Sequence, residues 1–351
     1  MKKLRLDVSE SPIATPRHFQ AMITFSPELK RRSLLSINDL SDAQMLEMID
    51  LAIDLKKRRD GGVRGDLLRR RNVALVFEKG STRTRCAAAI AAREEGGNVE
   101  YLNRNDIHIG AKESVKDSAR VLGRMFDGIL FRGFAQRTVE LLKEHSGVPV
   151  WNGLTDESHP TQILADLMTM KQAFGDIRGR KLVYIGDGRN NVANSLMLGC
   201  AKAGVNFVNC APEPLQPLPH LVKEAAAIAA RNGATVSVTA SPDEAAPGAN
   251  VLYTDVWVSM GEEAKKAERL ALLRPYQVNM DLCRKTGNLG GELLFLHCLP
   301  AFHDDQTEAS RDTGALEVTD DVFESDFSKV FDEAENRMHT IKALFVSALA
   351  D

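Results

Sequence analysis

Residues 73–93 read VALVFEKGSTRTRCAAAIAAR, and the fold prediction starts from this stretch. The apolar run 73–77 is typical of a strand buried on both faces, and 82–93 is expected to form a helix. The segment Ser81-Thr-Arg-Thr-Arg85 lies at the turn between them. Free backbone N–H groups and the helix dipole favour an anion at such a turn, and hydroxyls and guanidiniums would add charge-assisted donors. The alternative is an ordinary Ser/Thr helix cap with solvated arginines.

Strands and helices alternate along most of the chain. A capping box formed by Ser41 and Gln44 predicts an amphipathic helix before the first strand. After the turn we expect strands at 99–102, 129–131 and 148–151, and helices at 114–126, 138–145 and 161–174. The alternation restarts with a strand at 182–185 and a helix at 191–203, then strands at 206–210, 235–239, 251–254 and 293–297, and a last helix over 336–349.

Two such alternating runs predict an α/β fold: two doubly wound parallel-sheet domains with an active-site cleft between them. We expect an N-terminal extension over 1–30, a first domain over 31–155 and a second domain over 156–332. Ligands of such domains bind at the carboxyl ends of the strands, so the residues that follow strands are the candidates for function.

Composition narrows the class of protein. The chain has 351 residues with 45 Lys and Arg against 48 Asp and Glu, a formal net charge of -3, which argues against a nucleic-acid binder. The longest hydrophobic run, 86–92, is far too short to cross a membrane. The five cysteines are scattered without a C-x-x-C pair, which argues against a disulfide framework and a zinc site. Without a signal-peptide core at the N-terminus, a reducing, cytoplasmic location is expected.

Two further motifs follow strands of the first run. Arg132-Gly-Phe134 ends one strand, and His159-Pro-Thr-Gln162 opens a helix. A neutral histidine and a glutamine near a bound phosphoester could donate hydrogen bonds to a developing oxyanion. Either motif alone would be read as having a structural role. Because both follow strands of the first run, we group them with residues 81–85 as one candidate site.

Three motifs follow strands of the second run. The segment 186–191, GDGRNN, starts like a dinucleotide-binding loop but lacks the third glycine of that motif. This argues against the alternative of a nicotinamide-dependent enzyme. The segment 255–261, DVWVSMG, offers a carboxylate that can hold an ammonium ion. In 297–300, HCLP, Cys298 lies near His303, Asp304 and Asp305, but the spacing matches no usual zinc pattern. We therefore expect no metal and no cofactor, with a core cysteine as the alternative reading of Cys298.

In this order the motifs resemble the aspartate/ornithine carbamoyltransferase family, and within it the ornithine carbamoyltransferases. The resemblance runs from about residue 30 to the C-terminus and also includes Phe77-Glu78-Lys79, Lys112-Glu113-Ser114 and Glu335-Asn336-Arg337. It implies transfer of the carbamoyl group from carbamoyl phosphate to the side-chain amine of L-ornithine, giving L-citrulline and phosphate, or the reverse phosphorolysis. The first domain would bind carbamoyl phosphate, with a C-terminal helix over 333–351 packed back on it, and the second would bind ornithine.

The resemblance also assigns roles to single residues. Carbamoyl phosphate would be bound by Ser81, Thr82, Arg83, Thr84, His108, Arg132, His159, Gln162 and Arg337. Ornithine would be bound by Asn191, Asp255, Ser259, Met260, Cys298 and Leu299. Catalysis would rest on Arg132, His159, Asp255 and Cys298. The family implies a homotrimer or an assembly of trimers, in which the loop that carries Lys112 reaches into a neighbour's site.

The chain departs from the family pattern in that loop, where His108 replaces the usual Gln and Ala111 the usual His. A histidine donor at 108 would make carbamoyl-phosphate affinity depend on pH near neutrality, unless His108 simply faces solvent. Two alternatives therefore stay open beside the main reading. One is a carbamoyltransferase for putrescine or another amine, and the other is a catalytically silent paralogue that acts as a binding subunit.

Overall fold

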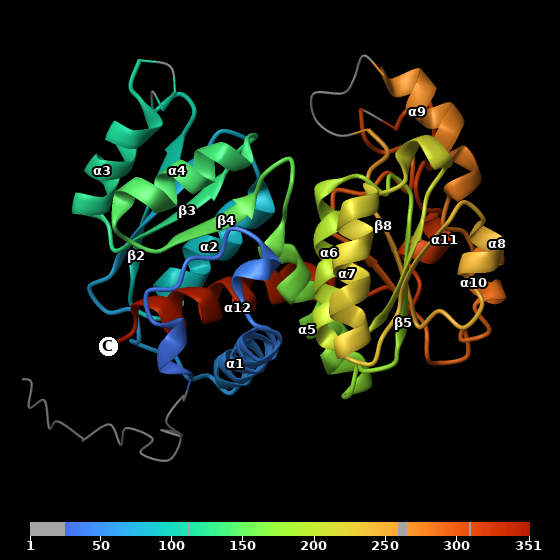
Figure 1. Cartoon of the computed structure of the whole chain (residues 1–351), viewed down its shortest axis with the longest axis horizontal. Coiled ribbons are helices and arrows are strands. Elements are labelled where there is room, and N and C mark those ends of the chain that lie inside the picture. Colours follow the sequence, from blue (N-terminus) through green and yellow to red (C-terminus); the bar gives the residue numbers. More distant parts are fainter. Residues whose placement is uncertain (1–24, 108, 111, 259–264, 309) are drawn as a thin grey trace, which may run out of the picture.

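The computed structural model describes residues 25–107, 109–110, 112–258, 265–308 and 310–351, and contains two parallel β-sheets. The first sheet has the order β2-β1-β3-β4, with β1 (Asn72–Phe77), β2 (Asn98–Asn103), β3 (Gly128–Arg132) and β4 (Val150–Leu154). The second has the order β7-β6-β5-β8-β9, with β5 (Lys181–Ile185), β6 (Asn206–Cys210), β7 (Val236–Thr239), β8 (Val251–Thr254) and β9 (Leu294–His297). Figure 1 shows the sheets at opposite ends of the long axis.

Helices cover both faces of the first sheet because its strands are apolar on both sides. Val73 and Leu75 of β1 pack into one core with α2 (Thr82–Glu94) and α12 (Val330–Leu349). Ala74 and Val76 pack into another core with α3 (Val115–Met125) and α4 (Gln136–Ser146). Successive side chains of a strand point to opposite faces, so one short apolar run serves both cores.

The second sheet is covered in the same way. One face packs on α6 (Asn191–Ala203) and α7 (Pro219–Arg231). The other face packs on the short helices α8 (Pro242–Ala245), α10 (Met280–Lys285) and α11 (Asp320–Phe323). The remaining short elements are α9 (Lys266–Leu273) and the 3-10 turns η1 (Pro27–Leu29), η2 (Ile37–Asp39), η3 (Glu213–Leu215) and η5 (Arg274–Tyr276). The α/β class with two parallel sheets that the sequence predicted is confirmed.

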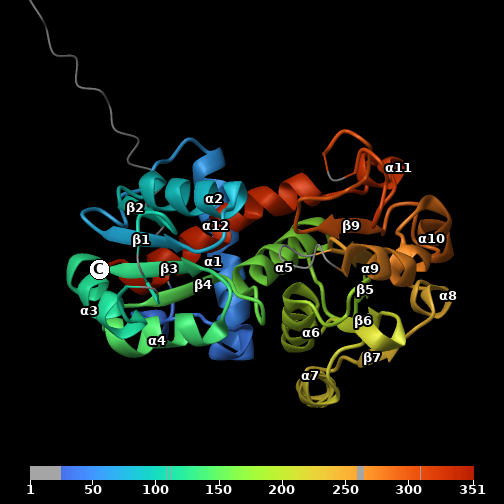
Figure 2. The same ribbon diagram turned by 90° about the horizontal axis from the view of Figure 1, so that it is seen from above.

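Three helices join the two halves: α1 (Asp42–Asp60), α5 (Pro160–Phe174) and α12. Just before α12, the backbone N–H of Lys329 donates to the carbonyl of Phe295 in the second sheet at 3.0 Å. The helix then packs against α5, α1 and α2, and Figure 2 shows it running from the second half over the first. It begins at Val330, six residues before the predicted start at 336, because Val330 is buried in the core of the second half.

No described helix combines the length and the hydrophobicity that crossing a membrane would require.

Candidate active site

The turn after β1 forms the first part of the site. Ser81 caps α2, since its Oγ accepts a hydrogen bond from the backbone N–H of Thr84 at 3.2 Å. The cap holds the first turn of the helix with its free N–H groups directed out of its N-terminus. Ser81 is half-buried and Thr82 is exposed, whereas Thr84 is fully buried.

Three arginines from three elements meet at this turn. The Oγ1 atom of Thr84 accepts from Nη2 of Arg337 on α12 at 2.8 Å and from Nη1 of Arg132 at the end of β3 at 3.4 Å. Arg83 Nη2 donates to the carbonyl of Leu299 at 2.6 Å. The Nε atoms of Arg132 and Arg337 are buried and have no hydrogen-bond partner among the described residues. Buried guanidiniums with spare donors at a helix N-terminus can hold an anion.

Burial of these cations changes their acidity. Burial, together with the neighbouring Arg337, lowers the pKa of Arg132 to about 9. Burial also lowers the pKa of Arg337 to about 10, with Arg83 acting in the same direction. Both remain cations at neutral pH, but their hydration has been replaced by protein, so an anion placed among them would be strongly stabilised.

His159 and Gln162 lie at the start of α5, beside this cluster. Burial, and then the cations of Arg337, Arg132 and Arg83, lower the pKa of His159 well below its ordinary value, so its ring is neutral. Its Nδ1 is buried and has no partner among the described residues. Gln162 Nε2 donates to Asp166 Oδ1 at 2.8 Å and to Glu333 Oε1 at 2.6 Å, while its Oε1 is buried without a described donor.

Asp255 and Cys298 follow the neighbouring parallel strands β8 and β9. The Cys298 thiol donates to Asp255 Oδ1 at 3.1 Å, and burial together with Asp255 raises the pKa of that thiol well above its ordinary value. Cys298 is therefore a neutral thiol. Asn190 Nδ2 donates to Asp255 Oδ2 at 3.2 Å and to the Tyr184 hydroxyl at 2.6 Å, which fixes the carboxylate from the side of α6.

The segment after Cys298 connects the two halves of the site. Leu299 has φ 58° and is followed by a cis peptide bond to Pro300. Its carbonyl is the atom that accepts from Arg83. A residue that follows the second sheet thus touches the helix N-terminus of the first.

Ligand atoms of Asp255, His297 and Cys298 lie within 4.8 Å of one another, which raises the question of a metal. His297 Nδ1 accepts from the backbone N–H of Leu299 at 2.9 Å, and Nε2 faces Glu317 Oε1 at 3.3 Å. Nδ1 is therefore engaged with the backbone, and Nε2 lies next to Glu317 without a hydrogen bond in the described structure, so the arrangement does not favour metal binding.

Two family models cover nearly the whole chain. The carbamoyl-phosphate-binding domain of aspartate/ornithine carbamoyltransferases matches residues 32–172, and the aspartate/ornithine-binding domain matches 178–348. The chain belongs to the aspartate/ornithine carbamoyltransferase family. The family resemblance seen in the sequence is thereby confirmed.

Several family members are very similar to this chain. A catabolic ornithine carbamoyltransferase of Bacillus licheniformis is 56% identical over 329 residues, covering 92% of this chain and 98% of the relative. A catabolic enzyme of the same name from Streptococcus ratti is 54% identical over 326 residues, covering 91% and 96%. Among solved structures, the ornithine carbamoyltransferase of Pyrococcus furiosus has a TM-score of 0.84 at 39% identity, covering 92% of this chain and 98% of that one.

Within this family member, the structure brings together most of the residues that the sequence singled out. Arg83, Thr84, Arg132, His159 and Arg337 form one cluster. Asp255 and Cys298 adjoin it through Arg83, whose pKa is lowered by burial while the Asp255 carboxylate favours its charge. Asn191 Nδ2 donates to the carbonyl of Thr155 at 2.5 Å, at the boundary between the two halves. Lys112 is exposed. His108, Ser259 and Met260 lie outside the described residues.

Arg85 corrects the sequence interpretation. Its side chain was counted among the donors of the turn, but its guanidinium lies over the ring of Tyr101 at 3.8 Å from the centroid and is exposed. Two residues along a helix from Arg83, it points to a different side of α2, because successive residues are rotated by about 100°. Ser81 forms the helix cap that the sequence also allowed, and its expected contact with phosphate stays a prediction.

Sequence reasoning missed two fully buried carboxyl groups at the back of the site, Asp166 and Glu333. Asp166 lies four residues after Gln162, and Glu333 lies four residues before Arg337. The i,i+4 spacing on a helix places such pairs on the same face, and this signal could have found them.

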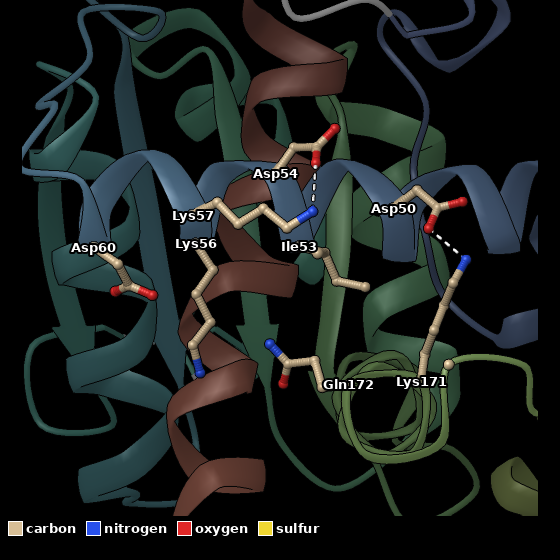
Figure 3. Close-up of a pocket in the computed structure, with 9 residues that line it drawn as sticks. Asp50, Ile53, Asp54, Lys56, Lys57, Asp60, Lys171 and Gln172 are labelled. Carbon is tan, nitrogen blue, oxygen red and sulfur yellow. Dashed lines mark hydrogen bonds and ion pairs between the residues drawn. The ribbon is translucent and has the colours of Figure 1, made fainter. Parts of the chain in front are cut away.

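A groove of about 580 Å³ lies elsewhere, between α1 and the end of α5 (Figure 3). Figure 3 shows Lys57 paired with Asp54 and Lys171 paired with Asp50 at its rim. None of the residues of the arginine cluster lines it, so this groove is separate from the candidate site.

Proposed function

We propose that the chain transfers the carbamoyl group between carbamoyl phosphate and the side-chain amine of L-ornithine. The amine nitrogen attacks the carbamoyl carbon, the bond from that carbon to the phosphate oxygen breaks, and the amine loses a proton, giving L-citrulline and phosphate. One observation carries the proposal: at a helix N-terminus, Arg132 and Arg337 donate to Thr84 beside Arg83, next to the Asp255–Cys298 pair. The curated relatives that carry the name ornithine carbamoyltransferase support it.

The phosphate end would be held by the N-terminus of α2. The backbone N–H groups after Ser81 and the hydroxyls of Thr82 and Thr84 would donate to it, together with the guanidiniums. Arg83, Arg132 and Arg337 would neutralise its charge without a metal ion. From the sequence, His108 would add a donor from the loop that also carries Lys112.

The carbamoyl end would lie between Arg132, His159 and Gln162. A neutral His159 can donate one N–H to the carbamoyl oxygen, and Arg132 and Thr84 are the further donors for the tetrahedral oxyanion. The Gln162 amide nitrogen already donates to two carboxyl groups, so its oxygen is the atom left to accept from the carbamoyl NH2 group. The protein mainly orients the reactants and stabilises the developing charge.

The amino-acid end would be held in the second half by Asn191, Asp255, Ser259, Met260, Cys298 and Leu299. The reacting amine must be neutral, yet an amine of this kind has a pKa of about 10.4, so roughly one in a thousand is reactive at pH 7.4. Asp255 would favour the charged form. It therefore suits the α-ammonium, or the reacting amine after that has lost its proton, with Cys298 as the neighbouring neutral group.

The relatives' names also bear on direction and assembly. Because several relatives at 52–56% identity are named catabolic, we propose that the chain works mainly in citrulline phosphorolysis, as part of arginine breakdown in the cytoplasm. We further propose a division into a carbamoyl-phosphate domain over 31–155 and an ornithine domain over 156–332, with the helix over 333–351 belonging to the first. The assembly would be a homotrimer or a multiple of it.

A substrate comparison tests the proposal. The protein is incubated with carbamoyl phosphate and, in separate reactions, ornithine, putrescine, N-acetylornithine or aspartate, and each carbamoylated product is measured. Turnover with ornithine alone is expected. Turnover with putrescine alone would show that the acceptor substrate is a diamine and not ornithine. No turnover with any amine, in a protein that still binds carbamoyl phosphate, would indicate a silent binding subunit.

A further inference from the structure

Asp166 on α5 and Glu333 on α12 meet in the interior behind Gln162. Both side chains are fully buried, and both accept from Gln162 Nε2, at 2.8 Å and 2.6 Å, which places their carboxyl groups side by side. At most one of them is therefore ionised, so the pair holds at least one proton. Two ionised carboxylates in contact would repel each other in a site without water to screen them. Neither residue belongs to the set that contacts substrate in the proposed reaction.

The hydrogen bonds show which of the two carries the proton. Glu333 Oε2 accepts from the backbone N–H of His297 at 2.9 Å. Glu333 Oε1 accepts from Gln162 Nε2 at 2.6 Å and from the Tyr253 hydroxyl at 3.3 Å. Asp166 accepts only from Gln162, on Oδ1 at 2.8 Å, and its Oδ2 has no donor among the described residues. Donors stabilise the ionised form, so Glu333 is the carboxylate and Asp166 the acid that donates to it.

The charged and titratable groups around the pair support this assignment. They come from every element packed against it: Cys200 on α6, Tyr253 on β8, His297 and Cys298 at the end of β9, and Arg337 on α12. Burial and the Glu333 charge raise the pKa of Asp166 well above its ordinary value, while Arg337 acts against them. Burial raises the pKa of Glu333 as well, but its hydrogen bonds to Asp166 and His297 oppose that rise.

We propose that Asp166 and Glu333 are positioning residues that share one proton and fix the orientation of the Gln162 amide. Both N–H bonds of that amide are directed at the pair, so its carbonyl oxygen faces away from it. The proposal rests on the function proposed above, because the group that this carbonyl would meet is the NH2 of carbamoyl phosphate.

Fixing this amide has a chemical purpose. The oxygen and the NH2 group of a carbamoyl are close in size, so shape alone cannot orient the group. A carbonyl acceptor at Gln162 selects the NH2 group and leaves the oxygen to Arg132 and His159, where negative charge develops. If the amide were reversed, two donors would face each other and the carbamoyl group would be misplaced.

Two isosteric substitutions distinguish the members of the pair. Asp166→Asn keeps a donor toward Glu333 and an acceptor for Gln162, so it is expected to leave carbamoyl-phosphate affinity within about threefold of wild type. Glu333→Gln places an NH2 group among the donors of Gln162, Tyr253 and His297, which favours the reversed Gln162 amide. Affinity for carbamoyl phosphate is then expected to fall at least about tenfold.

Inorganic phosphate provides the matched probe, because it occupies the arginine cluster but has no carbamoyl end. Dissociation constants for carbamoyl phosphate and for phosphate are measured by calorimetry on wild type, Asp166→Asn and Glu333→Gln, with circular dichroism to verify folding. Glu333→Gln should weaken carbamoyl phosphate alone. An equal loss for both ligands, or equal behaviour of the two variants, would overturn the proposal.

If Glu333→Gln does not fold, Asp166→Ala replaces it. This variant removes the donor to Glu333 and one acceptor of Gln162, and should weaken carbamoyl phosphate selectively, with Asp166→Asn restoring affinity. No selective loss would overturn the proposal. These binding measurements need no amine, so a failure of the ornithine assignment, seen as absent citrulline in wild type, is distinguishable from a failure of this inference.

Discussion

Arg83 is the side chain through which the two halves of the site touch. It lies in the first turn of α2, is half-buried, and donates to the carbonyl of Leu299 at 2.6 Å. Its position allows one guanidinium to contact a bound anion and, at the same time, the segment that carries Cys298.

Replacing Arg83 by Ala is therefore expected to nearly abolish turnover. Each charge-assisted hydrogen bond contributes about 1.5–3 kcal/mol, so loss of two corresponds to roughly a hundredfold or more. Arg85→Ala, two residues away, is the control, because Arg85 stacks on Tyr101 and should retain activity within a few fold. Steady-state citrulline assays on both variants decide the point, and full activity in Arg83→Ala would refute the anion site.

Cys298 tests the other half of the site. Its neutral thiol donates to Asp255 at 3.1 Å, so Cys298→Ala removes a group beside the amine and leaves Asp255 with one donor fewer. We expect kcat to fall by one to two orders of magnitude, about 1.4–3 kcal/mol. Rates at saturating substrates measure this directly. An unchanged kcat would remove Cys298 from the mechanism and leave it a packing residue.

At the scale of elements, α12 is held on α2 by a buried lysine. Lys342 Nζ lies 2.6 Å from Glu94 Oε2 and 4.0 Å from Glu95 Oε1. Burial raises the pKa of Glu94, but the hydrogen bond from Lys342 and the nearby Arg59 outweigh it and hold that pKa below its ordinary value. A carboxylate with a lowered folded pKa stabilises the fold above its unfolded pKa, and this contribution is lost as pH falls through the folded value.

Lys342→Met should consequently lower the free energy of unfolding by about 1–3 kcal/mol at pH 7. The difference from wild type should shrink as the pH falls below about 4, where Glu94 becomes protonated. Denaturant unfolding at several pH values measures both effects. Lys57→Met, which removes an exposed pair with Asp54, is the control and should change stability by less than about 0.5 kcal/mol. A pH-independent difference would show that Lys342 contributes by packing alone.

The same scale shows what the sequence could and could not predict. Strands such as β6 and β8 and the helix α6 were found with their observed bounds, because apolar runs, caps and glycines are local signals. The helix α7 was not assigned, and α12 was started too late, at 336. Its first turn is held by Val330 in the second core and by Glu333 against Asp166, and both contacts depend on residues far away in the sequence.

The site shows the same limit. The strand-to-helix turn at 81–85 and the placement of Arg132 and His159 after strands follow from the residues themselves. The convergence of Arg337 on Thr84 was expected only through the family resemblance, since 253 residues separate the two. The two hydrogen bonds that the Gln162 amide donates to carboxyl groups were not expected at all, because they require α5 and α12 to be in contact.

At the scale of the whole molecule, the candidate site lies where the carboxyl ends of two parallel sheets meet. Arg132 ends β3 in one half, while Asp255 and Cys298 follow β8 and β9 in the other. A site divided between two halves can bind one substrate on each and bring them together by small changes in their relative position. The family resemblance predicts a further division, between neighbouring subunits of the proposed trimer, with the exposed Lys112 reaching a neighbour's site.

Hybrid trimers test that division. If Lys112 serves a neighbour's site, trimers of Arg83→Ala alone and of Lys112→Ala alone should each be nearly inactive. In a hybrid trimer, one of the three sites between subunits combines an intact Arg83 with an intact Lys112 from the neighbouring subunit. In a cyclic trimer each hybrid contains one such site of three, so random mixing of equal amounts should restore about a quarter of wild-type activity. Wild-type trimers taken through the same dissociation and reassembly are the control. If Lys112 instead acts within its own subunit, every site in the mixture carries one of the two substitutions, and activity stays at the average of the two parents.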